Sequence, residues 1–226
     1  MNTTVVSLSR RSAHRNGSKS FPPGLSEVAS IALGIAAVLG LAGCGATRPM
    51  QYYQLSVPAD LQRAEPKATG ISLALGPLVA SHLYREDRIV YSSGPQQMGT
   101  YEFQRWTEPP AEMIQAVLLR ELRASGQYRD VFFQRSSSRA DYVLRGRLYD
   151  FKEVTANSLA ARVTVEFELR DTQSGSTVWS HYYSHDEPVS GKDVPAMVAA
   201  LDRNVQRGVN ELKTSLEQYF SSLPAK

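Results

Sequence analysis

The pattern of apolar and polar residues changes character along the chain. Residues 31–42 are an apolar run, IALGIAAVLGLA, that follows a polar stretch bearing Arg and Lys. From Tyr52 onwards, short segments rich in aromatic and β-branched residues alternate with turn-forming residues, which is typical of strands. Two later segments repeat apolar residues every three or four positions, which indicates helices with one buried face.

The strand-like segments predict a mostly antiparallel sheet. We expect strands at 52–57 and 71–80, a hairpin formed by RIVY and TYEFQRW around SSGPQQMG, and further strands at YRDVFFQ and ADYVLRGRLYDF. In ARVTVEFELRD the inward-facing side chains are expected to be Val163, Val165, Phe167 and Leu169, and the outward-facing ones Arg162, Thr164, Glu166 and Glu168. Such alternation predicts a sheet with one face in water. TVWSHYYSHDE is expected to return antiparallel beside it.

Two amphipathic helices complete the predicted domain. The first is expected to be capped by Thr107 and to end at Ser125-Gly126, and it carries Met113, Ile114, Val117, Leu118 and Leu122. The second carries an apolar stripe from Val194 to Phe220, with Asp193 as its cap. We interpret the stripe as core packing; the alternative is contact with another subunit or with lipid. The predicted fold class is α+β, a two-layer arrangement of a mostly antiparallel sheet with two helices packed on one face.

The only cysteine of the 226 residues, Cys44, directly follows the apolar run. That run has 12 residues, whereas a helix that spans a bilayer needs about 20, so it fits a signal peptide better than a permanent anchor. The sequence LAGCG resembles the bacterial lipobox, in which Leu41, Ala42 and Gly43 would be read by the signal peptidase and Cys44 would receive the lipid. Residues 1–43 are then the signal peptide, 44–51 the lipidated end and tether, and 52–226 one domain. The alternatives are a free buried thiol and, from Arg10-Arg11, twin-arginine export.

Charge and composition exclude several classes of function. Four basic residues and one acid precede Cys44, so 21 basic and 21 acidic residues remain from Cys44 onwards. The mature chain is formally neutral and shows no clustered basic surface, which argues against nucleic acid as a partner. One cysteine also excludes an internal disulfide.

The sequence offers little for catalysis, and we expect no enzymatic activity. Cys44 is committed to lipid, and we find no G-x-S-x-G, phosphate-binding glycine loop or H-E-x-x-H motif. His181 and His185 would lie on one face of a strand, but residues four apart in a strand are separated by about 13 Å, too far for one zinc ion. We therefore expect no cofactor and no metal, and a covalent lipid on Cys44 only.

The order and spacing of motifs after Cys44 resemble the ABC-type transport auxiliary lipoproteins, the PqiC-like family. The matching residues are Tyr52, Tyr53, Leu55, Gly76-Pro77, Ile89-Val90, Tyr101, Arg105-Trp106, Glu108-Pro109 and Ala140-Asp141-Tyr142. The resemblance implies a periplasmic lipoprotein that works with an MCE-type ABC system, which moves phospholipids or other hydrophobic molecules between the inner and outer membranes. By resemblance to enterobacterial sorting rules, Gly45 after the cysteine favours the outer membrane.

The expected partners are a periplasmic MCE-domain protein and the outer membrane, with a homo-oligomer left open. For partner binding we select Arg105, Trp106, Glu108 and Pro109, because Arg and Trp favour interface hot spots; the alternative is that Trp106 fills the core. A second hypothesis for function is an assembly lipoprotein of another outer-membrane machine, such as lipopolysaccharide export or a secretion pore. A third, an anchored hydrolase, has no motif to support it.

Overall fold

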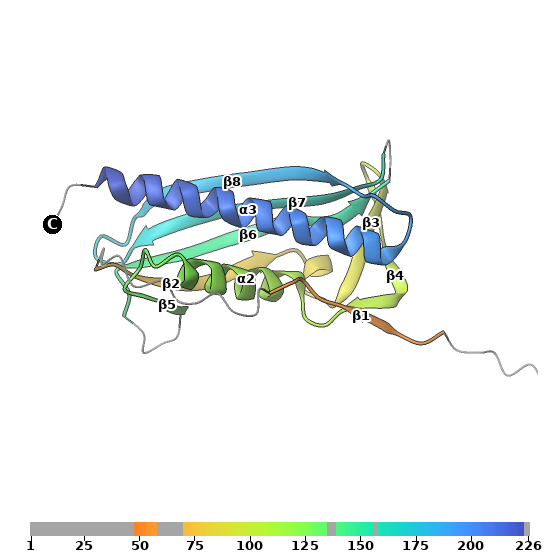
Figure 1. Cartoon of the computed structure of the whole chain (residues 1–226), viewed down its shortest axis with the longest axis horizontal. Helices are drawn as coiled ribbons and strands as arrows, with labels where there is room; N and C mark the ends of the chain where they lie inside the picture. The colour runs from red at the N-terminus through yellow and green to blue at the C-terminus, as the bar shows by residue number, and fades with distance from the viewer. Residues whose placement is uncertain (1–47, 58–69, 135–138, 156–157, 224–226) are drawn as a thin grey trace, which may run out of the picture. The chain divides into compact units, whose positions relative to one another are not determined.

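The computed structural model describes residues 48–57, 70–134, 139–155 and 158–223. These residues form strands and helices in the following order (Figure 1): β1 (Gln51–Tyr53), β2 (Ser72–Ala80), the 3-10 helix η1 (His82–Tyr84), β3 (Arg88–Gly94), β4 (Gln97–Trp106), α2 (Pro110–Ala124), β5 (Asp130–Phe133), β6 (Tyr142–Val154), β7 (Ala160–Asp171), β8 (Thr177–Pro188) and α3 (Val194–Ser222).

The sheet is organised around β6, whose two sides are used differently. Along one side β6 pairs with β7, which pairs with β8. Along the other side β6 pairs first with β2 and then, near its end, with β3. Next to these lie β5, beside β2, and β4 followed by β1, beside β3. One long strand therefore joins two smaller groups of strands into a single sheet.

The sheet contains both kinds of pairing. The two long pairs, β6 with β7 and β7 with β8, and the β3–β4 hairpin are antiparallel. The shorter pairs of β1 with β4, β2 with β5 and β6 with β2 and β3 are parallel. Most of the paired length is antiparallel, which confirms the predicted class.

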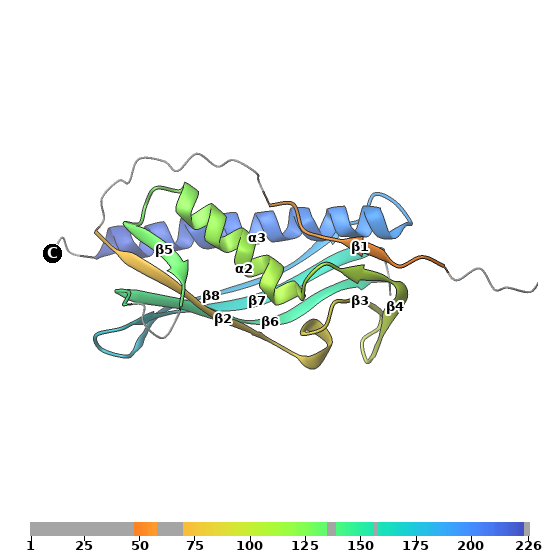
Figure 2. The same cartoon turned by 90° about the horizontal axis from the view of Figure 1, so that it is seen from below.

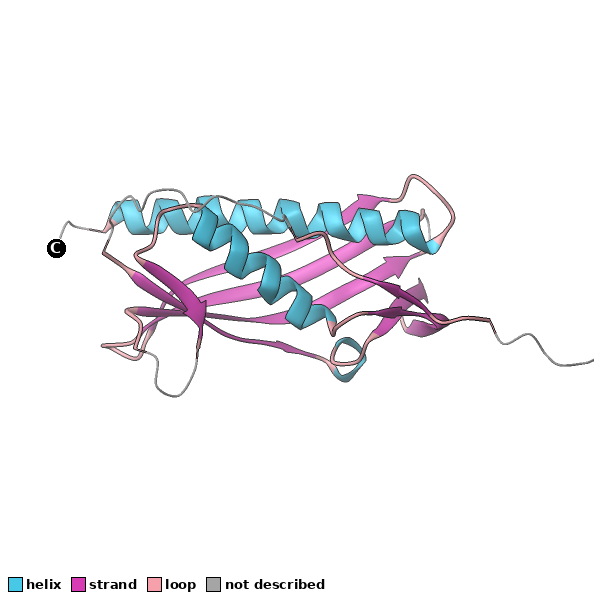
Figure 3. Cartoon of the chain, turned by 60° about the horizontal axis from the view of Figure 1, so that its bottom comes forward, coloured by secondary structure: helices cyan, strands magenta, loops and turns pink. Residues whose placement is uncertain are grey.

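Both α-helices cover the same face of the sheet, as Figures 2 and 3 show. The core lies between them and the sheet, and it includes the four inward-facing residues of β7. The five apolar residues predicted for the first helix are buried in α2. Along α3 the apolar stripe is buried from Met197 to Leu216. The interpretation of this stripe as core packing is thus confirmed.

Four local predictions differ from the structure. The first strand ends at Tyr53 rather than Val57, because the chain then turns its next residues onto α3. The hairpin strands continue through the predicted loop and leave only Pro95 and Gln96 between them. Thr107 does not cap α2, which begins at Pro110 after Pro109 with no side-chain cap. Thr164 is buried, because its strand is flanked on both sides and its hydroxyl lies 3.0 Å from that of Ser184.

A buried polar group joins α3 to the sheet. Asn204 is fully buried, and its Nδ2 donates to the backbone carbonyls of Ala161 and His185, both at 2.8 Å. Its Oδ1 accepts a hydrogen bond from the hydroxyl of Tyr183 at 2.5 Å. At Gly208, one turn further along α3, an added Cβ would come within 2.9 Å of the Tyr183 ring. The helix therefore has a fixed position over β7 and β8.

Candidate functional site

The segment that follows the predicted lipidation site is held against the sheet and α3. We call residues 48–57 the strap. Its strand β1 pairs in parallel with the end of β4, so that Tyr52 lies opposite Arg105 and Tyr53 opposite Trp106. The backbone N–H of Thr107 also donates to the Tyr53 carbonyl at 2.8 Å. The chain leading from Cys44 thus meets the predicted partner-binding segment directly.

Beyond β1 the strap is fixed by one buried side chain and two hydrogen bonds. Leu55 is only 1% exposed and belongs to the core. The backbone N–H of Ser56 donates to the carboxylate of Asp202 at 2.9 Å, and its carbonyl accepts from Gln206 Nε2 at 3.2 Å. The strap is therefore part of the packed domain.

The structure separates the four predicted partner-binding residues. Trp106 is 1% exposed and its ring packs against Phe151, with ring centroids 5.3 Å apart, so it occupies the core as in the alternative interpretation. Arg105 donates through Nη1 to the carbonyls of Tyr101, at 2.7 Å, and Gln104, at 3.0 Å. Both side chains are thus engaged within the domain.

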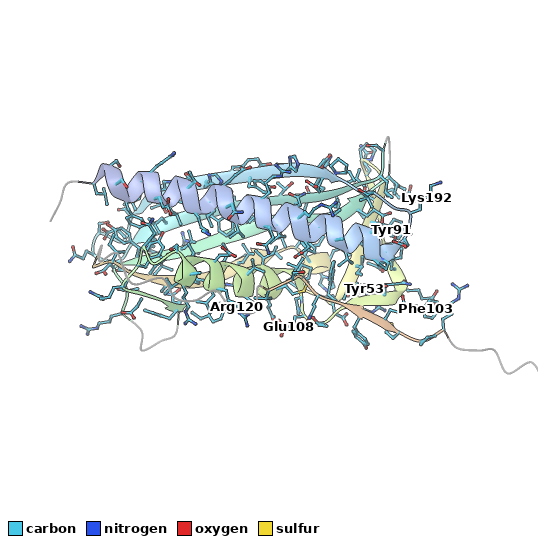
Figure 4. The ribbon with its side chains drawn as sticks, viewed as in Figure 1. Tyr53, Tyr91, Phe103, Glu108, Arg120 and Lys192 are labelled. Carbon is cyan, nitrogen blue, oxygen red and sulfur yellow. The ribbon has the colours of Figure 1, made fainter. Side chains whose placement is uncertain are left out.

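Glu108 and Pro109 lie where the chain leaves β4 and enters α2. Glu108 is exposed and Pro109 is half-buried; Figure 4 labels Glu108 beside the start of α2, and Tyr53 and Phe103 nearer the end of the sheet where the strap begins. Glu108 is the member of the predicted set whose side chain is most accessible to another protein. Binding of a partner by this set stays a prediction.

The lipobox residues Leu41, Ala42, Gly43 and Cys44 lie outside the described residues. Lipidation of Cys44 therefore stays a prediction from the sequence. Within the described part of the chain, neither α-helix combines the length and the apolar character needed to cross a bilayer.

The two histidines of β8 have other neighbours than a metal. His181 stacks on Trp179, with ring centroids 5.7 Å apart, and burial lowers the pKa of its imidazole. His185 lies 3.6 Å from the Glu187 carboxylate. Over residues 48–57, 70–134, 139–155 and 158–223, no three His, Cys, Asp or Glu side chains gather as a metal site.

Comparison with known proteins identifies the family. A family model described as the ABC-type transport auxiliary lipoprotein component matches residues 53–212. The chain belongs to this family. No curated protein matches the sequence. The family description names a transport component, which agrees with the absence of a catalytic motif from the sequence.

Solved structures resemble this auxiliary lipoprotein in fold. Protein XCC0632 from Xanthomonas campestris matches with a TM-score of 0.64 at 22% identity, covering 72% of this chain and 91% of that one. An uncharacterized protein matches with a TM-score of 0.61 at 15% identity, covering 75% and 99%. The PelC dodecamer from Paraburkholderia phytofirmans gives a TM-score of 0.41 at 19% identity, covering 65% and 90%, which is too low for an argument about assembly.

The helix–sheet interface of the auxiliary lipoprotein leaves little empty space. Two hollows lie there, one lined by residues of α2, β2 and β6 and one by residues of α2, α3, β7 and β8, and each holds about 10 Å³. That is about the room that one water molecule needs. A hollow of about 340 Å³ lies by contrast among Arg145, Arg147, Glu166 and Glu168. An acyl chain has no room in either of the two internal hollows.

Proposed function

We propose that this auxiliary lipoprotein is anchored at the periplasmic face of the outer membrane and serves an MCE-type ABC transport system. Such a system moves phospholipids or other hydrophobic molecules between the two membranes. The observation that carries the proposal is the family match over residues 53–212, joined to a lipobox that ends at Cys44. The role of the chain is attachment: it holds a transport component close to the outer membrane.

The packing of the strap supports an anchoring role. Two or three acyl chains on one cysteine give effectively permanent attachment, whereas a single chain gives marginal attachment. Any pull on this anchor reaches the domain through the strap, where the β1–β4 ladder and the buried Leu55 distribute it over the sheet and α3. A domain attached in this way stays folded while it is tethered.

The packed interior supports an adaptor in preference to a lipid carrier. A carrier needs an apolar cavity for its cargo, and ligand pockets generally measure about 300–1,000 Å³. The two internal hollows are far smaller. The hollow of about 340 Å³ is bordered by four charged side chains, which suit a polar group better than an acyl chain.

For the partner we propose a periplasmic MCE-domain protein, bound around Glu108 and Pro109. The lipidated protein should co-purify with the MCE protein in mild detergent, and Glu108→Lys should weaken this capture. Glu211→Lys, an equal charge reversal at an exposed position of α3, is the matched control. Capture of a lipopolysaccharide-export or secretion component, with no MCE protein, would instead favour an assembly role at another outer-membrane machine.

The anchor is tested by Cys44→Ala. The variant should lose its lipid, leave the membrane fraction and fail to complement a deletion strain, because the tether has no attachment point. Its circular dichroism and melting temperature should match those of the natural domain, since Cys44 precedes the strap. Full complementation by this variant would contradict the proposed role.

A further inference from the structure

The strap presents two large apolar side chains to solvent. Met50 is 44% exposed and Tyr52 is 62% exposed. Successive side chains of a strand point to opposite sides, so these two alternate residues share one side of the strap. Tyr53, on the other side, packs against the core. The fold thus buries Tyr53 and Leu55 but leaves Met50 and Tyr52 uncovered.

Chain length limits what can cover them. Six residue steps separate Cys44 from Met50, and an extended chain spans at most about 3.6 Å per residue. Met50 therefore lies within about 22 Å of the lipidated sulfur, and Tyr52 within about 29 Å. Once acyl chains on Cys44 enter a leaflet, the surface of that leaflet is within reach of both side chains.

The chemistry of this end of the domain suits a lipid surface. Tyrosine is enriched at membrane–water interfaces, where its ring lies at headgroup level. Arg48, exposed and two residues before Met50, can meet a lipid phosphate. Figures 1 and 2 show the β3–β4 hairpin at the same end of the domain, and its strand β4 carries Met98, which is 49% exposed. Lys192 also lies at this end (Figure 4).

We propose that Met50 and Tyr52 insert into the headgroup layer of the leaflet that holds the acyl chains of Cys44. This inference rests on the lipidation in the proposed function. The bilayer then serves as a docking surface as well as an anchorage, and the domain keeps one orientation on it. The strap end faces the lipid, and the C-terminal end of α3, at the opposite end in Figure 1, faces the periplasm.

The test uses the full lipidated protein in vesicles of phosphatidylethanolamine and phosphatidylglycerol. Tyr52→Cys is labelled with an environment-sensitive fluorophore, which Cys44 cannot take up because its thiol carries lipid. Tyr182→Cys on β8 is the matched control, since Tyr182 is 63% exposed. The label at 52 should be shielded from iodide and quenched by lipids with a nitroxide high on the acyl chain. The label at 182 should show neither effect.

The outcomes are distinguishable. A label at 52 that iodide reaches as readily as the label at 182, on protein that floats with the vesicles, overturns the inference and leaves the anchor intact. Shielding from iodide without quenching by the nitroxide lipid means that protein covers the strap, and this also overturns it. Protein that does not float and has an unmodified Cys44 by mass overturns both the anchor and the docking.

A second measurement leaves the reporter outside the strap. With the fluorophore on Met98→Cys, the substitutions Met50→Ser and Tyr52→Ser together should reduce quenching by the nitroxide lipid. Val178→Ser with Tyr182→Ser, which removes two exposed apolar side chains from β8, should leave it unchanged. Equal quenching in both double variants would contradict a docking role for the strap.

Discussion

Asn204 contributes to stability through groups that only the fold brings together. Its side chain serves two backbone carbonyls and the Tyr183 hydroxyl in a fully buried position. A buried polar group left without a partner costs about 1–3 kcal/mol. We expect Asn204→Ala to lower the free energy of unfolding by about 3 kcal/mol, because several groups lose their partner at once. Urea denaturation measures this.

The matched control for Asn204 is Asn210→Ala, an exposed position of the same helix. Its effect should stay within about 0.5 kcal/mol, as for most surface substitutions. An equal loss of stability in both variants would mean that helix propensity, rather than the buried hydrogen bonds, decides the outcome.

Glu187 links β8 to α3 by charge. The hydrogen bonds from Arg203 and Arg207 lower the pKa of its carboxyl group, against the opposing effect of burial. A carboxylate with a lowered pKa contributes stability that is present at neutral pH and lost as the pH falls through its folded pKa. The melting temperature should therefore fall on acidification below about pH 4.5.

Part of that fall should disappear in Glu187→Gln, which cannot titrate. Glu211→Gln, at an exposed position without a resolved ion pair among the described residues, should melt with the same pH dependence as the natural protein. Asp186, whose pKa is lowered by the hydrogen bond from Arg162, contributes in the same direction, so some dependence should remain in Glu187→Gln.

Among the elements, the strap is the one whose attachment depends on a single buried side chain. Leu55→Ala should cost about 2–4 kcal/mol, the usual range for a buried leucine. It should also raise hydrogen exchange at the Tyr53 and Thr107 amides more than in the rest of the sheet. Met50→Ala, an exposed change in the same segment, should leave both unfolding and exchange unaltered. Uniform exchange throughout the sheet of Leu55→Ala would contradict local attachment.

Sequence periodicity predicted elements whose pattern is local. The stripes of α2 and α3 and the alternation of β7 were recognisable because each element buries one face. The shared side of β6 was not predictable, since the pairing of β2 and β3 with successive parts of one strand is a tertiary choice. The same limit applies to Asn204, which interrupts an apolar stripe and finds its partners on distant strands.

At the scale of the whole molecule, the length of the tether is a functional quantity. Insertion of about 20 Gly/Ser residues after Gly45 adds roughly 25 Å of flexible reach. The variant should stay lipidated and in the membrane fraction but complement a deletion poorly, because the domain no longer keeps its height. The same insertion within 58–69, predicted to be an exposed loop, is the control and should complement normally.

The functional surface could be predicted from the sequence only in part. Arg105, Trp106, Glu108 and Pro109 were selected by residue type, and the structure leaves mainly Glu108 accessible. Trp106 has the composition of a hot spot but the position of a core residue. Met50 and Tyr52 gave no sequence signal, because alternation in so short a strand does not reveal which side the fold covers.

The outer side of β8 has a consequence for neighbouring copies. Among the described strands, β8 pairs with β7 alone, so its other side offers unpaired backbone groups along a strand of 12 residues. Such a row invites antiparallel union with its own duplicate. That union requires two molecules pointing in opposite directions, whereas molecules rooted in one leaflet at the same end all point the same way. A common polarity on the membrane thereby protects β8 from self-adhesion, as a lysine or proline would in a freely diffusing protein.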